Sequence, residues 1–184
     1  MIRGEEGTDV DYKESPQAVT PEDIVALANA RGGTIIVGVK EQRKDGRQYG
    51  EIIGCSTGEE ERRKLLHKAS SCFPPMNITL TEEGSGTRKV IRVDVPEAPA
   101  KPCCSPSGAY KIRRGSINVA IDPQLMTTLI LQRESDQFLS RFKEAGKEVI
   151  SALKKTENYL DARIQEAQDA AEEAASAAED AASR

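Results

Sequence analysis

The sequence predicts an α/β (α+β) fold, in which helices pack on a mixed sheet and a long C-terminal helix or coiled coil follows. The first two thirds of the 184 residues hold β-branched runs, glycines and prolines, as a sheet with turns requires. After Pro123 there is no further proline, and Glu, Ala, Lys and Leu dominate, which favours helix. We therefore expect one domain over residues 1–124 and a helical oligomerisation segment over residues 125–184.

Composition limits the core and the partners. Aromatic residues make up only 4% of the chain, so the core must consist mainly of Val, Ile and Leu. The net charge is -4, and the acidic excess lies in the C-terminal segment. A tight duplex binder is usually strongly basic, so a nucleic acid must be bound by a local patch. The candidate basic residues are Arg88, Lys89, Arg92, Lys111, Arg113 and Arg114.

The N-terminal elements follow from capping residues and periodicity. Residues 8–13 alternate in polarity, which predicts a short edge strand. Thr20 is the expected N-cap of a helix, with Pro21 at its first position, and this helix ends near Ala30. The apolar run over residues 34–40 predicts a central strand that is covered on both faces.

The middle of the chain predicts a second helix. Ser56 or Thr57, followed by the acids at 59–61, forms a capping-box pattern before a helix that ends near Ser71. Leu65 and Leu66 are expected to face the core.

Further strands surround and follow that helix. A brief strand is predicted at residues 51–54. The stretches 77–81 and 90–95 alternate and form one strand pair, and residues 109–114 and 117–121 form another, hinged at Gly115.

The C-terminal segment carries apolar residues at alternating steps of three and four, with Glu157 as the one polar interruption: Ile150, Leu153, Leu160, Ile164, Ala167, Ala171, Ala174, Ala178 and Ala181. This spacing predicts a coiled-coil seam and a homo-oligomer, most simply a dimer. A solvated single helix is the alternative, because Ala and Glu favour helix on their own.

The chain has no apolar run near the ~20 residues of a membrane span, so we expect a cytoplasmic protein with no membrane partner. Its four cysteines are then expected as reduced thiols. A zinc site made by His67, Cys72, Cys103 and Cys104 is disfavoured, because the spacing fits no closed finger pattern.

Three segments carry a family resemblance. Residues 6–13 read EGTDVDYK, residues 24–39 read IVALANARGGTIIVGV, and residues 110–116 read YKIRRGS. In this order and at these separations they resemble the Schlafen AlbA-type domain, over roughly residues 5–125. Gly32 and Gly33 also have a purely structural explanation, because they let the chain reverse from helix to strand. Asn29 similarly suits a polar contact at the helix end.

The resemblance implies a metal site and a nucleic-acid surface. In nuclease members of the family, three carboxylates bind a divalent metal, and the matching positions here are Glu6, Asp11 and Glu41. Oxygen donors of this kind suit Mg²⁺ or Mn²⁺. Lys13 would contact the phosphate or the leaving oxygen. The expected nucleic-acid contacts are Lys111, Arg113, Arg114, Arg88 and Arg92.

Two departures from the family pattern bear on this metal site. Asp11 stands where Glu is more usual, and Lys40 lies beside Glu41 and could neutralise it.

Several functions are therefore open. The first is a metal-dependent endoribonuclease that cuts structured, tRNA-like RNA as a homodimer. The second is a non-catalytic module or transcription regulator that binds RNA or DNA. A third is an interaction role for the acidic, Ala-rich C-terminal segment. ATP binding is not expected, because the chain has no G-x-x-x-x-G-K-[ST] phosphate loop.

Overall fold

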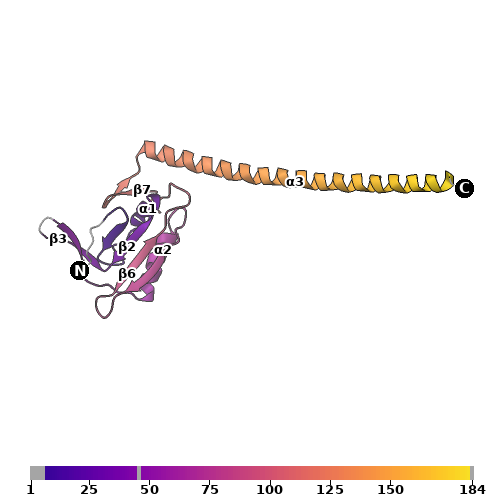
Figure 1. The fold of residues 1–184 in the computed structure, drawn as a ribbon. Coiled ribbons are helices and arrows are strands. Elements are labelled where there is room, and N and C mark those ends of the chain that lie inside the picture. The colour runs from indigo at the N-terminus through magenta and orange to yellow at the C-terminus, as the bar shows by residue number, and fades with distance from the viewer. Residues whose placement is uncertain (1–6, 45–46, 183–184) are drawn as a thin grey trace. The chain divides into compact units, whose positions relative to one another are not determined.

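The computed structural model describes residues 7–44 and 47–182. The chain forms two compact units, Met1–Arg133 and Glu134–Arg184. Its elements, in chain order, are β1 (Val10–Lys13), α1 (Pro21–Asn29), β2 (Gly33–Val37), β3 (Val39–Lys44), β4 (Arg47–Ile52), α2 (Glu59–Ser70), β5 (Thr79–Glu83), β6 (Val90–Val95), β7 (Lys111–Arg114), β8 (Ile117–Ala120) and α3 (Pro123–Ala182) (Figure 1). None of the helices in these two ranges combines the length and apolar content that crossing a bilayer requires.

The main sheet has four strands in the order β1-β2-β6-β5. The pair β1 and β2 is parallel, with Asp11 opposite Ile35, and the other two pairs are antiparallel. The pairs β3–β4 and β7–β8 form separate two-stranded sheets. This mixed sheet with helices confirms the predicted fold class, and β1 lies at an edge, as expected.

The core lies where α1 and α2 meet the main sheet. Apolar residues of α1 and α2 pack with those of β2 and β6, and Ile24, Leu27, Ile35, Leu65 and Ile91 are among the fully buried ones. A smaller cluster is built around Tyr12, Val39 and Val90. The core therefore consists of aliphatic side chains, as the composition predicted.

The two domain helices begin differently. Thr20 caps α1 as predicted, with Pro21 in the first turn, and its hydroxyl accepts a hydrogen bond from the Asp23 backbone N–H. The capping box predicted for α2 is wrong. Gly58 is the N-cap there, and no side chain caps that end. Leu66 was expected to face the core with Leu65, but it is 46% exposed.

One strand is interrupted where the sequence predicted continuity. The apolar run over residues 34–40 divides at Gly38, which has a φ of 98°, a conformation that favours glycine. The Gly38 carbonyl accepts hydrogen bonds from the N–H groups of Ile53 and Gly54. The chain therefore leaves the main sheet after Val37 and continues as the β3–β4 hairpin.

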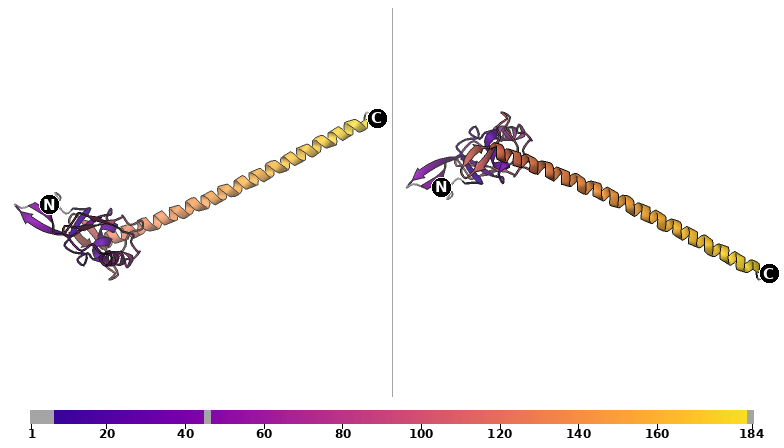
Figure 2. Two further views of the ribbon diagram at one scale, coloured as in Figure 1. Left: turned by 90° about the horizontal axis from the view of Figure 1, so that it is seen from below. Right: turned by 90° about the horizontal axis from the view of Figure 1, so that it is seen from above.

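The C-terminal helix α3 begins at Pro123, as predicted, and continues unbroken to Ala182 (Figure 2). The part of α3 up to Arg133 belongs to the first compact unit, and the rest of the helix belongs to the second.

Candidate functional site

Asp11 lies in a cluster of charged side chains beneath the start of β1. It is 3% exposed. One of its carboxylate oxygens, Oδ2, lies 2.8 Å from Lys13 Nζ, and the other, Oδ1, lies 3.1 Å from Arg113 Nη1. The negative charge of Asp11 is thus balanced by two cations, one of which is itself buried.

Arg113 is 5% exposed and joins β7 to the start of β1. Its Nε donates to the Gly7 carbonyl at 3.1 Å, and its Nη2 donates to the Val10 carbonyl at 3.0 Å. Its Nη1 donates to Asn118 Oδ1 on β8, also at 3.1 Å. We conclude that Arg113 fixes the path of the chain before and into β1.

Lys13 and Asn118 connect this cluster to the first turn of α1. Lys13 Nζ lies 3.3 Å from Asp23 Oδ1, and Asn118 Nδ2 donates to the same oxygen at 2.8 Å. Burial acts to lower the pKa of Lys13, but the hydrogen bond to Asp11 and the negative charges of Asp23 and Asp11 raise it overall. We call Asp11, Lys13, Asp23, Arg113 and Asn118 the β1 charge cluster.

The other two predicted metal ligands do not join this cluster within the described residues. Glu6 lies outside the described part of the chain. Glu41 is exposed on β3, opposite Gly50 of β4. The neighbouring Lys40 approaches Glu14, at 4.0 Å, and no ion pair is described between Lys40 and Glu41.

Over residues 7–44 and 47–182, no group of three or more His, Cys, Asp or Glu side chains is placed to hold a metal ion. The donors described here fit Mg²⁺ or Mn²⁺ poorly, because both Asp11 oxygens already face cations. The complete set of Glu6, Asp11 and Glu41 stays a prediction.

The predicted nucleic-acid contacts lie in two separate segments of the domain. Arg88 and Arg92 belong to the β5–β6 turn and β6, whereas Lys111, Arg113 and Arg114 belong to β7. Arg88 is exposed. Arg92 is half-buried and pairs with Glu83 at 2.9 Å and with Asp94 at 3.0 Å.

The β7 cations also have acidic neighbours. Arg114 is exposed and lies 3.4 Å from Asp122. Lys111 lies near Glu22, whose pKa is lowered mainly by hydrogen bonding from Ser105 and less by the charge of Lys111. Of the predicted basic residues, Arg88 and Arg114 are thus exposed, Arg92 and Lys111 are half-buried, and Arg113 is buried.

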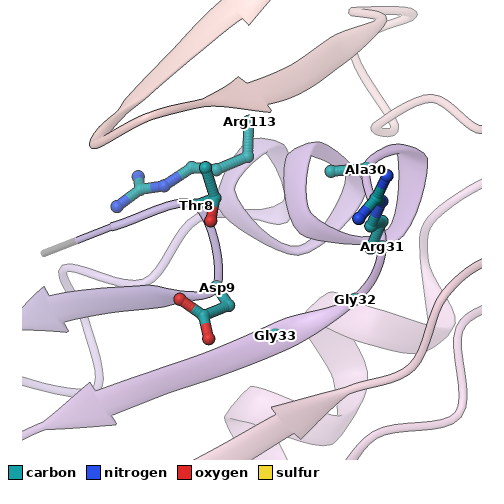
Figure 3. Close-up of a pocket in the computed structure, with 7 residues that line it drawn as sticks. All are labelled: Thr8, Asp9, Ala30, Arg31, Gly32, Gly33 and Arg113. Carbon is teal, nitrogen blue, oxygen red and sulfur yellow. The ribbon is translucent and has the colours of Figure 1, made fainter.

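A pocket of about 490 Å³ lies between the start of β1 and the turn that follows α1 (Figure 3). Arg31 and Asp9 stand on opposite sides of it, and Arg113 extends away from Arg31. Arg31 is not among the residues predicted from the sequence, because a single arginine after a helix gives no signal of its own. In the fold, however, Arg31 is exposed beside this pocket.

Gly33 allows the close approach of β1 and β2 at this point. A Cβ atom on Gly33 would lie 2.5 Å from the Asp9 carbonyl oxygen, and its φ of 156° disfavours other residues. The same Asp9 carbonyl accepts the Thr34 N–H at 2.7 Å. The structural explanation of this glycine is therefore confirmed.

Asn29 holds the end of α1 against the segment that leads into β7. It is 2% exposed. Its amide nitrogen donates to the carbonyls of Cys103 and Lys111, both at 2.8 Å. Its amide oxygen accepts the Cys103 N–H at 2.8 Å. The polar contact expected for Asn29 is confirmed, and its partners are residues that the sequence could not identify.

All four cysteines are free thiols, and Cys72 and Cys103 are fully buried. Burial raises the pKa of each of these two thiols to about 11. They are therefore protonated at neutral pH and behave as core residues.

Residues 6–122 match the model of the family described as Schlafen, AlbA_2. No curated protein matches the chain. Among solved structures, the chain is similar to the N-terminal domain of an ATP-dependent DNA helicase RecG-related protein from Nitrosomonas europaea, with 23% identity and a TM-score of 0.47, over 66% of this chain and 85% of that one. It is also similar to the DIP2311 protein from Corynebacterium diphtheriae, with 19% identity and a TM-score of 0.46, over 62% of this chain but only 25% of that one.

Proposed function

The chain belongs to the Schlafen AlbA_2 family, and we propose that it is a nucleic-acid-binding protein whose domain binds the phosphate backbone through exposed cations. The burial of Asp11 between Lys13 and Arg113 carries this proposal. This burial gives Asp11 a structural role. Nucleic-acid binding does not require Asp11 to hold a metal, so binding is a simpler function for this surface than catalysis.

The exposed cations are suited to phosphate because their present ion pairs are weak. Exposed pairs such as Arg114–Asp122 contribute little to stability because water screens them, so a phosphate can replace the acid at little cost. Arg88 and Arg31 are also exposed. Arg113 differs, because withdrawing it would leave a buried carboxylate without one of its cations. We therefore assign phosphate contacts to Arg31, Arg88 and Arg114, with the half-buried Lys111 and Arg92 at the margin.

This proposal is tested by mobility shift of a mixed tRNA and DNA pool in EDTA. Binding should persist without a metal, and Arg114→Ala together with Arg88→Ala should weaken it for all sequences alike. Lys64→Ala is the control, because Lys64 is also an exposed cation but lies on α2, away from β6 and β7 in the chain. Loss of binding in EDTA would contradict the proposal.

A metal-dependent endoribonuclease acting on tRNA-like RNA is the second candidate. It is favoured by the position of Lys13, whose side chain is 20% exposed and lies between two carboxylates. In this function Glu6, Asp11 and Glu41 would hold Mg²⁺ or Mn²⁺, and Lys13 would contact the phosphate. For the described residues this requires Asp11 to give up at least one of its cations.

The same nucleic-acid pool, incubated with Mn²⁺, Mg²⁺ or EDTA, separates the two candidates. Metal-dependent cleavage that is lost in Glu6→Gln but retained in Glu5→Gln would establish the nuclease. Intact RNA and DNA under all three conditions would leave binding alone. Glu6→Gln is preferred over an Asp11 variant here, because Asp11 also supports the fold.

We further propose that the protein acts as a homodimer through α3, as the coiled-coil pattern predicts. The support is the exposure of large apolar side chains along this helix, including Phe138 and Phe142, whose rings stack at a centroid distance of 6.2 Å.

A further inference from the structure

The helix α3 exposes many large apolar side chains. Within its described residues, nine of them are more than half exposed: Leu131, Phe138, Phe142, Val149, Ile150, Leu153, Tyr159, Leu160 and Ile164. Exposed apolar residues in such number along one helix indicate a surface that is covered in the assembled protein.

Seven of these residues follow a regular spacing. The steps between them alternate between seven and four residues, so the pattern repeats every 11 residues. The seven residues are Leu131, Phe138, Phe142, Val149, Leu153, Leu160 and Ile164. Ala171 and Ala175 continue the same steps. Eleven residues span three turns at about 3.67 residues per turn, close to the 3.6 of a straight helix, so these side chains form one stripe.

This stripe describes α3 better than the heptad seam that starts at Ile150. When the heptad steps are continued toward the N-terminus, they reach Gly146, Lys143, Leu139 and Asp136, of which only Leu139 is a large apolar residue. They leave out Phe138 and Phe142, which have the most exposed large apolar side chains in the described part of α3. The 11-residue stripe includes both and places no charged residue between Leu131 and Ala175 among its members.

We propose that α3 pairs in parallel with α3 of a second copy of this chain, along the 11-residue stripe, and that the two helices wind around each other with a slight right-handed twist. An 11-residue repeat gives this handedness, whereas a heptad repeat gives a left-handed one. The proposal rests on the self-association proposed above and is independent of nucleic-acid binding.

The apolar area of the stripe approaches that of a stable dimer interface. Burying a large aliphatic or aromatic side chain removes roughly 60–120 Å² of apolar surface from water, as judged from its transfer free energy. Seven such residues give about 400–800 Å² per chain. A standard stable interface buries about 800 Å² per partner, and alanines and the methylene groups of neighbouring residues add to the stripe.

The charges beside the stripe fit a second copy in parallel orientation. At 11 residues per three turns, Arg163 lies on one edge of the stripe, and Asp161, two residues earlier, lies on the other. In a parallel pair opposite edges meet at the same height, so Arg163 of one copy faces Asp161 of its partner, twice over in the symmetric dimer. Within one helix Arg163 pairs with Glu166 at 2.8 Å, but this pair is exposed and is replaced at little cost.

Two adjacent residues provide the matched test. Val149 lies on the 11-residue stripe, and Ile150 lies on the heptad seam; they are 59% and 57% exposed and both are β-branched. Glu is a good helix former, so Val149→Glu and Ile150→Glu should both retain the helix by circular dichroism. The full chain and both variants are then compared by sedimentation equilibrium.

We expect a mass of twice 20.0 kDa for the full chain. Val149→Glu should weaken dimerisation by at least about tenfold, because it buries two carboxylates, and Ile150→Glu should weaken it much less. A monomeric full chain overturns the proposal, and so does a weakening by Ile150→Glu that equals or exceeds the weakening by Val149→Glu. Mobility shift of the monomeric variant then reports separately on nucleic-acid binding.

Orientation is measured by energy transfer between donor and acceptor dyes attached enzymatically at the C-terminus. A parallel pair brings the two C-termini together, so mixed labelled chains should show high transfer. In an antiparallel pair, helices of 60 residues separate the C-termini by up to about 90 Å. Negligible transfer in a sample of dimeric mass would contradict the parallel orientation.

Discussion

Asp11 and Lys13 stand two residues apart on β1, so their side chains leave the same face of the strand. That face also receives Arg113 from β7, and all three side chains meet beneath the start of β1. A buried carboxylate with two cations is costly to disrupt from either side, because removing one partner leaves a buried charge uncompensated. The β1 charge cluster is therefore expected to be important for stability.

Replacing Asp11 tests this expectation. Asp11→Ala should lower the free energy of unfolding by about 3 kcal/mol or more, since Arg113 stays buried without its carboxylate. Asp9→Ala is the control, because Asp9 is exposed on the same segment, and its replacement should cost no more than about 0.5 kcal/mol. Urea unfolding followed by circular dichroism measures both. Equal effects for the two variants would show that the cluster adds little to stability.

Asn29 provides a second test at the residue scale. Asn29→Ala should cost about 2–4 kcal/mol, because it leaves the carbonyls of Cys103 and Lys111 and the Cys103 N–H without partners. Asn77→Ala, at an exposed position, should cost less than about 0.5 kcal/mol. Thermal unfolding of the two variants compares them, and a mild effect of Asn29→Ala would mean that water replaces these contacts.

The buried thiols predict a pH dependence. The folded state raises the pKa of Cys72 and Cys103 from 9.0 to about 11, so the unfolded state loses these protons first. Their contribution to stability is fully present below pH 9 and is lost as the pH rises toward 11. The decrease is on the order of 2 kcal/mol per thiol. Chemical denaturation at pH 8 and at pH 10.5 measures it.

The control for this pH dependence is the double variant Cys72→Ala with Cys103→Ala. Its free energy of unfolding should fall less between the two pH values, even if it is lower overall. Lys13, whose pKa is raised above 10.5, still contributes in both proteins at the upper end of this range. Identical slopes for wild type and double variant would contradict the assignment.

At this scale the sequence identified the residue types better than their contacts. The polar role of Asn29 and the need for glycine at Gly33 followed from local pattern. The pairing of Asp11 with Arg113 did not, because the two residues are 102 positions apart and meet only through the β1–β7 arrangement. The same contact encloses Arg113, which the family resemblance placed with Lys111 among the expected nucleic-acid contacts.

Local capping chemistry decided how well the elements could be predicted. Thr20 and Pro21 specify the start of α1, and the observed helix begins there. The sequence Ser56-Thr57 gives a similar signal, yet α2 begins after Gly58 without a side-chain cap. The bounds of α2 were therefore predicted closely, but the capping box on which the predicted start rested is absent.

These two helix starts offer a matched test. Thr20→Ala should lower the free energy of unfolding by about 1 kcal/mol, the usual cost of losing an N-cap. Ser56→Ala should change it by less than about 0.5 kcal/mol, because Ser56 does not cap α2. Urea unfolding of both variants compares them, and an effect of Ser56→Ala as large as that of Thr20→Ala would be inconsistent with the observed α2 N-terminus.

Strand order was less accessible to prediction than strand position. Most strands fell near their predicted places, since alternation and turns mark them. The parallel pairing of β1 with β2 and the departure of β3 from the main sheet depend on contacts between distant segments. Gly38 shows the limit, because the valines on either side of it, Val37 and Val39, give no sign that the chain leaves the main sheet there.

For the whole molecule, charge distribution links fold and function. The domain carries balanced charge, and its exposed cations lie beside acids, so any nucleic-acid binding should be moderate and sensitive to salt. The proposed α3 pairing would place two such surfaces in one assembly, and two linked weak sites bind more tightly than one. The composition predicted that a nucleic acid must be bound by a local basic patch. That the predicted cations are divided between β6 and β7 could be seen only in the fold.

The most direct measurement is fluorescence anisotropy of a labelled tRNA-length RNA with the full chain in EDTA, between 50 and 200 mM salt. We expect binding whose affinity falls with salt. The triple variant Arg88→Ala, Lys111→Ala and Arg114→Ala should bind more weakly, with a logarithmic salt slope shallower by about 0.7–0.9 for each phosphate that the variant no longer neutralises. No binding at 50 mM salt, or a triple variant with unchanged affinity and slope, would contradict the account.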